Sequence, residues 1–172
     1  AERRETQTMG KLLIVDDEPS VCYSLEKRLR SETLEVLTAG TARLGIQMIE
    51  EHRPDVVLLD VRLPDQSGLD AFERIHDLEP QLPVIIITAH GTTETAIEAM
   101  KRGAFEYLLK PPDLAVLRDV VARALEISRL SRTPAVYDQE DTEDPAVDRI
   151  VGHAQVMQEV YKGIGRVAPQ DV

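Results

Sequence analysis

What this sequence has little of already limits its function. It contains a single cysteine, Cys22, so an internal disulfide is excluded and we expect a chain that works in the reducing cytoplasm. Cys22 falls within a helical pattern, which predicts a packed thiol rather than a nucleophile. The 20 Lys and Arg residues are outnumbered by 31 Asp and Glu residues, giving a formal net charge of −11. Nucleic-acid binding needs a basic face, so we expect no direct nucleic-acid contact by this chain.

Long apolar stretches are also missing. No run approaches the roughly 20 residues that a membrane-spanning helix needs. The first residues lack the charged and apolar regions of a secretory signal. We therefore expect a soluble, cytoplasmic protein without a membrane partner.

Residues 11–131 alternate between two kinds of segment. Short apolar runs without alternation are typical of strands that are buried on both faces of a parallel sheet. We expect these strands at residues 12–15, 34–38, 56–59, 83–88 and 105–109. Helical spacing or capping residues predict helices at about residues 19–31, 41–52, 67–78, 92–103 and 113–130. The alternation predicts an α/β fold: a doubly wound, flavodoxin-like parallel sheet of five strands in the order 2-1-3-4-5, with five helices.

Three further segments flank this predicted domain. Residues 1–10 are mostly polar and lack periodicity, which indicates a disordered leader. Residues 132–148 contain Pro134, Pro145 and several acids, as expected of a flexible acidic linker. Helical spacing returns in residues 149–172, which are too few to fold alone and are interpreted as the start of a second domain.

Polar residues stand at the carboxyl ends of four predicted strands. They are Asp16 and Asp17, Asp60, Thr88 and Lys110, after the first, third, fourth and fifth strands respectively. Because these strand ends share one edge of the predicted sheet, we expect the side chains to converge. Three converging carboxylates repel one another unless a cation lies among them. No His or Cys stands with them, so the set favours Mg²⁺, or Mn²⁺, over zinc.

This set of groups favours phosphoryl transfer to an aspartate. A nucleophilic carboxylate, a divalent cation and a lysine are the groups that such a reaction needs. Taken alone, Asp60 would more often be a residue that opens a turn. A phosphatase of the haloacid dehalogenase type would need a second Asp two positions after Asp60, where this chain has Arg62.

The stretches LLIVDDEPSV, PDVVLLDVRLPDQSGLD and PVIIITAHGTTETAIEAMKRGAFEYLLKP resemble the receiver domains of two-component response regulators. The resemblance covers residue 11 to about residue 130. It implies that Asp60 accepts a phosphoryl group from a histidine kinase. It also implies that Mg²⁺ is held by Asp17, Asp60 and the backbone carbonyl of Arg62, with Asp16 acting through water.

The same resemblance assigns the switch residues. Thr88 and Lys110 match the two residues that bind the phosphoryl group. Tyr107 matches the aromatic residue that rotates inward when Thr88 is drawn toward the phosphate. A half-buried strand aromatic without that role remains the alternative for Tyr107. The pair Lys110-Pro111 matches a Lys-Pro pair in which a cis bond is expected.

Residues 150–168 resemble the opening of the AAA+ domain in NtrC-type, sigma-54-dependent activators. The likeness implies a full-length protein that works with an AAA+ domain and sigma-54 RNA polymerase. No Gly-rich loop ending in Lys-Thr or Lys-Ser follows, so we expect no ATPase activity from this chain. We do not expect an enzyme, but Mg²⁺-dependent self-phosphorylation from phosphodonors and slow autodephosphorylation.

The last predicted helix is apolar on more than one side. Its inward line is expected to be Leu114, Leu117, Val121 and Leu125, and its second line Val116, Val120, Ile127 and Leu130. A second apolar line needs a second partner. We therefore expect a homodimer through the face built by residues 92–103, 105–109 and 113–130. Two alternatives remain open: a phosphorylation-independent receiver used for protein contacts, and a stand-alone receiver without a second domain.

Overall fold

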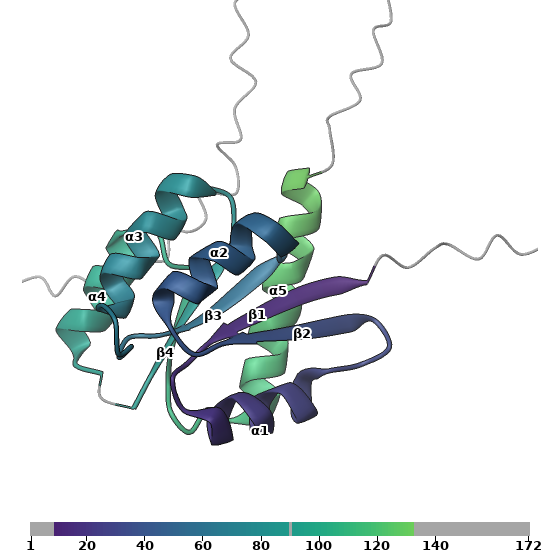
Figure 1. Cartoon of the computed structure of the whole chain (residues 1–172), viewed down its shortest axis with the longest axis horizontal. Coiled ribbons are helices and arrows are strands. Elements are labelled where there is room, and N and C mark those ends of the chain that lie inside the picture. The colour runs from purple at the N-terminus through teal and green to yellow at the C-terminus, as the bar shows by residue number, and fades with distance from the viewer. Residues whose placement is uncertain (1–8, 90, 133–172) are drawn as a thin grey trace, which may run out of the picture. The chain divides into compact units, whose positions relative to one another are not determined.

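A computed structural model of the chain describes residues 9–89 and 91–132. Helices lie on both faces of a single sheet (Figure 1). The strands are β1 (Gly10–Val15), β2 (Leu34–Ala39), β3 (Val56–Asp60), β4 (Val84–Thr88) and β5 (Glu106–Leu109). The helices are α1 (Pro19–Leu29), α2 (Ala42–His52), α3 (Gly68–Leu78), α4 (Thr93–Lys101) and α5 (Leu114–Arg132). The predicted alternation of five strands and five helices is confirmed.

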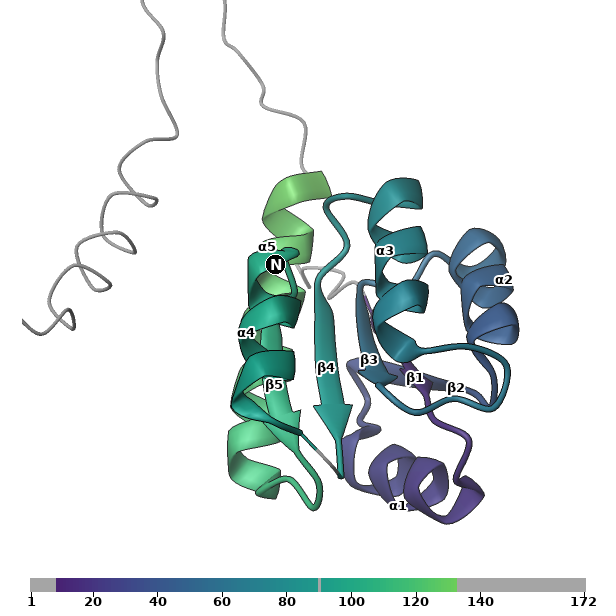
Figure 2. The same cartoon turned by 90° about the vertical axis from the view of Figure 1, so that its left-hand side faces the viewer.

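The sheet has the strand order β2-β1-β3-β4-β5, and every neighbouring pair is parallel (Figure 2). In this register Asp60 of β3 lies opposite Ile87 of β4, and Thr88 of β4 lies opposite Leu109 of β5. The carboxyl ends of these strands therefore meet at one edge. The predicted flavodoxin-like order is confirmed.

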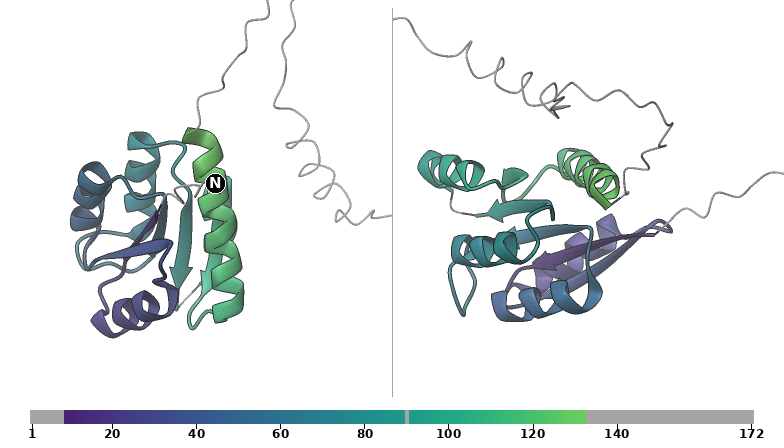
Figure 3. Two further views of the ribbon diagram at one scale, coloured as in Figure 1. Left: turned by 90° about the vertical axis from the view of Figure 1, so that its right-hand side faces the viewer. Right: turned by 90° about the horizontal axis from the view of Figure 1, so that it is seen from above.

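Successive strand residues point into two separate core layers. Leu12, Ile14 and Leu58 pack with α1 and α5 on one face. Leu13 and Leu59 pack with α2, α3 and α4 on the other. Figure 3 shows α5, in green, lying alongside the strands. Burying one such branched side chain stabilises the fold by about 1.5–3 kcal/mol, which makes the strands a rigid base for the residues at their ends.

Side-chain caps fix where the helices after α1 begin. The Thr41 hydroxyl accepts a hydrogen bond from Leu44 N (3.1 Å), and Asp113 Oδ1 accepts one from Ala115 N (2.8 Å), as predicted. Thr92 caps α4, and Thr93 is its first helical residue. Among the described residues, no helix is both long and apolar enough to cross a membrane.

Two predicted domain boundaries are corrected. Gly10, placed in the leader, pairs with Leu34 and donates its N–H to Thr33 O (2.9 Å), so it belongs to β1. Arg132, placed in the linker, ends α5, where its guanidinium pairs with Asp55. The other predicted leader residues up to 8, the linker from 133 and the second-domain start lie outside the described residues.

The prediction for Val120 was wrong. It was assigned to a second, outward apolar line of α5, yet it is only 2% exposed. Val120 packs in the layer between the sheet, α1 and α5, beside Leu117 and Val121. The outward apolar residues that remain are Val116, Ile127 and Leu130.

Candidate functional site

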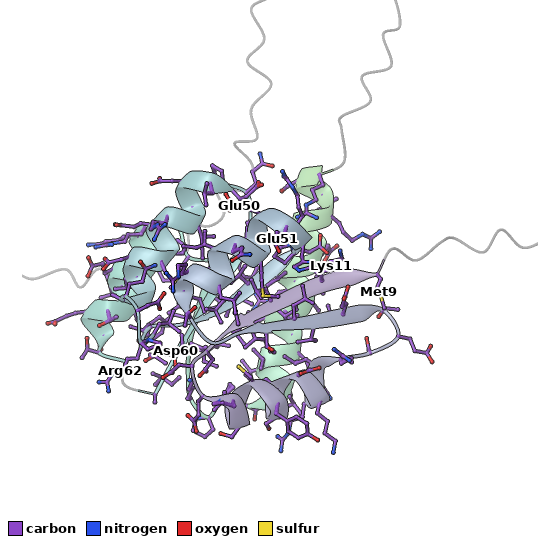
Figure 4. All side chains as sticks on the ribbon, viewed as in Figure 1. Met9, Lys11, Glu50, Glu51, Asp60 and Arg62 are labelled. Carbon is purple, nitrogen blue, oxygen red and sulfur yellow. The ribbon has the colours of Figure 1, made fainter. Side chains whose placement is uncertain are left out.

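Charged and polar side chains are buried at the carboxyl edge of the sheet. Asp16, Asp60 and Thr88 are 1%, 5% and 1% exposed, whereas Asp17 is exposed. Figure 4 places Asp60 and Arg62 toward one end of the sheet and Lys11 at the other end. Buried carboxylates are costly unless they are paired, so the contacts of this group determine what it does.

The three acids predicted to converge do so. Asp16, Asp17 and Asp60 each offer a carboxylate oxygen, and these atoms lie within 4.8 Å of one another. The turn after β1 holds Asp16 in place, because Glu18 N donates to Asp16 Oδ1 at 2.9 Å. Arg62 N donates to Asp60 Oδ1 at 3.1 Å, which sets the Arg62 backbone beside the acids. A compact set of oxygen donors with excess negative charge fits a hard divalent cation such as Mg²⁺.

Lys110 lies between two of these acids. Its Nζ donates to Asp16 Oδ2 at 2.5 Å and to Asp60 Oδ2 at 2.6 Å. Burial acts to lower the pKa of Lys110, but the hydrogen bonds to the two carboxylates outweigh it and the pKa is raised. Lys110 therefore stays positively charged. The peptide bond between Lys110 and Pro111 is cis, as expected.

Tyr107 lies on β5 beside the strand that ends in Thr88. Its hydroxyl is buried without a hydrogen-bond partner among the described residues, and burial raises the pKa of this phenol. A Cβ atom at Gly91 would lie only 2.1 Å from that hydroxyl. The ring thus points inward, against the loop that follows Thr88. Its role as the relay of the switch stays a prediction.

Two further contacts lie close to the site, one made by Asp65 and one by Cys22. Asp65, in the loop after β3, accepts hydrogen bonds from Ala42 N (3.0 Å) and Arg43 N (2.9 Å) of α2. No sequence pattern indicates this contact, which spans more than 20 positions. Cys22 is buried, as predicted, and its Sγ donates to Asp16 O at 3.3 Å. Burial, aided by Asp16, raises the pKa of the Cys22 thiol to about 11.

The comparison with protein families decides the identity of this domain. The response regulator receiver domain matches residues 12–122. The chain belongs to this family. "Response regulator protein PilR" of Pseudomonas aeruginosa is 40% identical to this receiver over 158 residues, covering 92% of this chain and 34% of PilR. "DNA-binding transcriptional regulator NtrC" of Proteus hauseri is 33% identical over 163 residues, covering 95% of this chain and 34% of NtrC.

A solved structure extends the similarity. The crystal structure of NtrX from Brucella abortus in complex with ADP is 34% identical, with a TM-score of 0.68, and the match covers 95% of this chain and 35% of NtrX. The resemblance to receivers of NtrC-type regulators is thereby confirmed. The receiver chain spans about a third of the length of these relatives.

Proposed function

We propose that this receiver is a phosphorylation-controlled switch in which Asp60 accepts a phosphoryl group from a sensor histidine kinase. One observation carries the proposal. Asp60 is a nearly buried carboxylate that shares a lysine with Asp16 and lies within 4.8 Å of two other acids. That arrangement costs stability, so it favours a chemical role over a structural one.

In the proposed reaction, a carboxylate oxygen of Asp60 donates an electron pair to phosphorus. The bond between phosphorus and the imidazole nitrogen of the donor histidine breaks, and its electron pair stays on the nitrogen. Lys110, already 2.6 Å from Asp60 Oδ2, neutralises charge on the transferred group. The Thr88 hydroxyl, at the end of the adjacent strand, donates to a phosphoryl oxygen.

We assign the metal site to the same residues. Asp16, Asp17, Asp60 and the backbone carbonyl of Arg62 would hold Mg²⁺, or Mn²⁺ in its place. When bound, the ion would offset the charge of the carboxylates and of the phosphoryl oxygens. The support is the donor set itself, which is compact and made only of oxygens.

Phosphorylation would act on the structure by adding about two negative charges at Asp60. Thr88 moves toward the phosphoryl group, and Tyr107 follows it. The α4–β5–α5 face is thereby biased between two packings. The close approach of the Tyr107 hydroxyl to Gly91, in the loop after β4, supports this coupling, because a shift of one would change the space available to the other.

The α4–β5–α5 face is our proposed homodimer interface. Its elements carry exposed apolar side chains, among them Ile97, Met100, Leu109 and Val116, each between 44% and 56% exposed. Apolar groups gathered on one face favour burial against a partner. This surface also includes parts that the switch would move, so phosphorylation would alter dimerisation.

In the longer protein, we propose that this switch controls a sigma-54-type transcription activator in the cytoplasm. Residues 149–172 would begin an AAA+ domain, and residues 133–148 would serve as the acidic linker to it. That domain would contact sigma-54 RNA polymerase, and DNA binding would lie elsewhere. Support comes from the likeness to a DNA-binding transcriptional regulator and to an NtrX that binds ADP.

Intact mass spectrometry tests the central step. After incubation with acetyl phosphate and Mg²⁺, we expect the wild-type chain to gain one phosphoryl group, and Asp60→Asn or EDTA-treated protein to gain none. Asp55→Asn, at the other end of β3, is the matched control and should be phosphorylated normally. If the wild type gains nothing, or Asp60→Asn gains as much, the proposal fails. A phosphorylation-independent receiver would then be the better interpretation.

A further inference from the structure

The loop that follows Asp60, residues 61–67, is closed tightly at its base. Gly68 N donates to Val61 O at 2.8 Å, and Arg62 and Ser67 form an isolated bridge. A Cβ atom at Gly68 would lie 2.1 Å from Asp60 O, so only glycine permits this closure. The base of the loop is thus fixed to the end of β3.

The tip of the loop is held by a different element. Asp65 Oδ1 accepts from Ala42 N (3.0 Å), and Oδ2 accepts from Arg43 N (2.9 Å). These are the first two N–H groups of α2, which have no acceptor within the helix. The hydroxyl of Thr41, the N-cap residue of α2, accepts a hydrogen bond from the third N–H group, that of Leu44. Asp65 therefore completes the cap of α2 from another segment of the chain.

The electrostatics favour this contact. A carboxylate at a helix N-terminus is stabilised by the N–H groups and by the helix dipole. Burial acts to raise the pKa of Asp65, but the N–H groups of Arg43 and Ala42 outweigh it and hold the pKa below its usual value. The contact is consequently present at neutral pH.

We propose that Asp65 is a positioning residue for the phosphoacceptor site. The Arg62 backbone is already held by its N–H bond to Asp60 and by the bridge with Ser67. By holding the loop tip against α2, Asp65 adds a further restraint on that backbone, whose carbonyl the proposed function assigns to the metal. The inference thus rests on the proposed function and deepens it. Among the described residues, the loop tip is also held by an exposed hydrogen bond from Arg74 to Gln66 (3.2 Å). Loss of Asp65 leaves the loop attached to α3 but free to shift from α2.

Two substitutions separate positioning from simple destabilisation. Asp65→Ala and Thr41→Ala both remove hydrogen bonds to the first turn of α2, but only Asp65 belongs to the loop. We expect Asp65→Ala, in the 172-residue chain, to weaken Mg²⁺ binding measured by isothermal titration calorimetry about fivefold. That is less than for a residue bonded directly to a ligand, because Asp65 acts one step further out. Thr41→Ala should bind Mg²⁺ within about twofold of wild type, with a similar loss of melting temperature.

Two further measurements complete the test: the dependence of the phosphorylation rate on Mg²⁺ concentration, and the Mg²⁺ affinity of the conservative variant Asp65→Asn. The phosphorylation rate of Asp65→Ala with acetyl phosphate should return toward the wild-type rate at saturating Mg²⁺. Asp65→Asn keeps an acceptor oxygen without the charge, and should show intermediate Mg²⁺ affinity. Amide exchange of Ala42 and Arg43, followed by NMR, should be fastest in Asp65→Ala.

The outcomes distinguish the two levels of the proposal. The inference about Asp65 is overturned if Asp65→Ala binds Mg²⁺ as the wild type does, or if Thr41→Ala loses as much affinity. Should Asp65→Ala fail to fold, wild-type affinity in Asp65→Asn with faster Ala42 exchange overturns it equally. If the wild type itself neither binds Mg²⁺ nor gains a phosphoryl group, the proposed function fails instead.

Discussion

Strand β3 is flanked by one aspartate before its first residue and ends in another, and the two carboxylates have different partners. Asp55, just before the strand, accepts from Lys11 N at 2.8 Å and pairs with Arg132 at 2.5 Å. Asp60, the last residue of the strand, shares Lys110 with Asp16 and has Asp17 nearby. Asp55 joins β1, the start of β3 and the end of α5. Asp60 pairs with a cation that a second buried carboxylate, Asp16, also uses.

The difference between Asp55 and Asp60 separates charges that stabilise the fold from charges that are suited to a reaction. At the amino edge, charges are paired one to one: Asp55 with Arg132, and Arg53 with Glu79. At the carboxyl edge, three carboxylates lie together and two of them share one ammonium group. Paired charges at the first edge support the packing around them. Excess charge at the second lowers stability, as is common where function selects the residues.

The largest expected effect is that of removing the cation from the carboxyl edge. Lys110→Met leaves Asp16 and Asp60 buried without their partner, and should lower the free energy of unfolding by about 3 kcal/mol at pH 7. Arg132→Met, at the exposed pair of the amino edge, should cost about 0.5 kcal/mol. Urea denaturation without divalent cations measures both. A larger loss for Arg132→Met would reverse the comparison.

The Cys22 thiol lies next to the carboxyl edge, where its Sγ contacts the backbone of Asp16, so its reactivity depends on that edge. With its pKa raised from 9.0 to about 11, chiefly by burial and then by Asp16, the folded protein should react with a thiol reagent at pH 8 about a hundredfold more slowly than the unfolded chain. Because the folded-state pKa is the higher one, the neutral thiol contributes stability that is present below pH 9 and lost as the pH rises toward 11. Fast labelling of folded protein at pH 8 would contradict this.

The same substitution, Asp to Asn, is expected to change the free energy of unfolding in opposite directions at Asp60 and at Asp55. Asp60→Asn relieves repulsion among the acids and should raise the free energy of unfolding by about 1 kcal/mol without metal. Asp55→Asn weakens the contact with Arg132 and should lower it by about 1 kcal/mol. Denaturant midpoints at pH 7 provide the measurement. If the denaturant midpoints of both variants shift in the same direction, excess negative charge is not what makes Asp60 differ from Asp55.

The smallest effect should come from an exposed pair at the amino edge. Arg53 and Glu79 lie 3.0 Å apart with side chains that are 71% and 44% exposed. Glu79→Gln should change the free energy of unfolding by about 0.3 kcal/mol or less, because water and salt screen such pairs. Thermal melting at low and high salt checks it. A loss above that of Asp55→Asn would show that exposure is a poor guide to these contributions.

The carboxyl edge is more predictable from the sequence than the amino edge, for a physical reason. The residues of β3 between its two aspartates are fully buried, so they form a continuous apolar run that is visible in the sequence. Once the strands are known, parallel pairing alone brings their last residues together. The contact between Asp55 and Arg132 joins positions 77 apart and depends on how far α5 extends, which no local pattern indicates.

Two other misses have the same origin in packing. The apolar spacing along α5 is compatible with either side of the helix facing the sheet, and only the contact with α1 and the strands places Val120 inside. Asp65 looks like an ordinary loop acid, and its role as a cap depends on the loop reaching the start of α2. In both cases, the deciding quantity is the placement of one element on another.

Gly91 has a consequence for protein engineering. A Cβ atom there would lie 2.1 Å from the Tyr107 hydroxyl and 2.9 Å from Leu109 Cδ2, so the loop after β4 and strand β5 are matched in shape. A chimera that takes β5 from one receiver and this loop from another inherits a mismatch unless positions 91 and 107 are exchanged together. In a combinatorial library, Gly91→Ala needs both a side chain shorter than tyrosine at position 107 and a shift of the Leu109 side chain. When receiver domains are recombined, residues 91 and 107 should therefore come from the same parent.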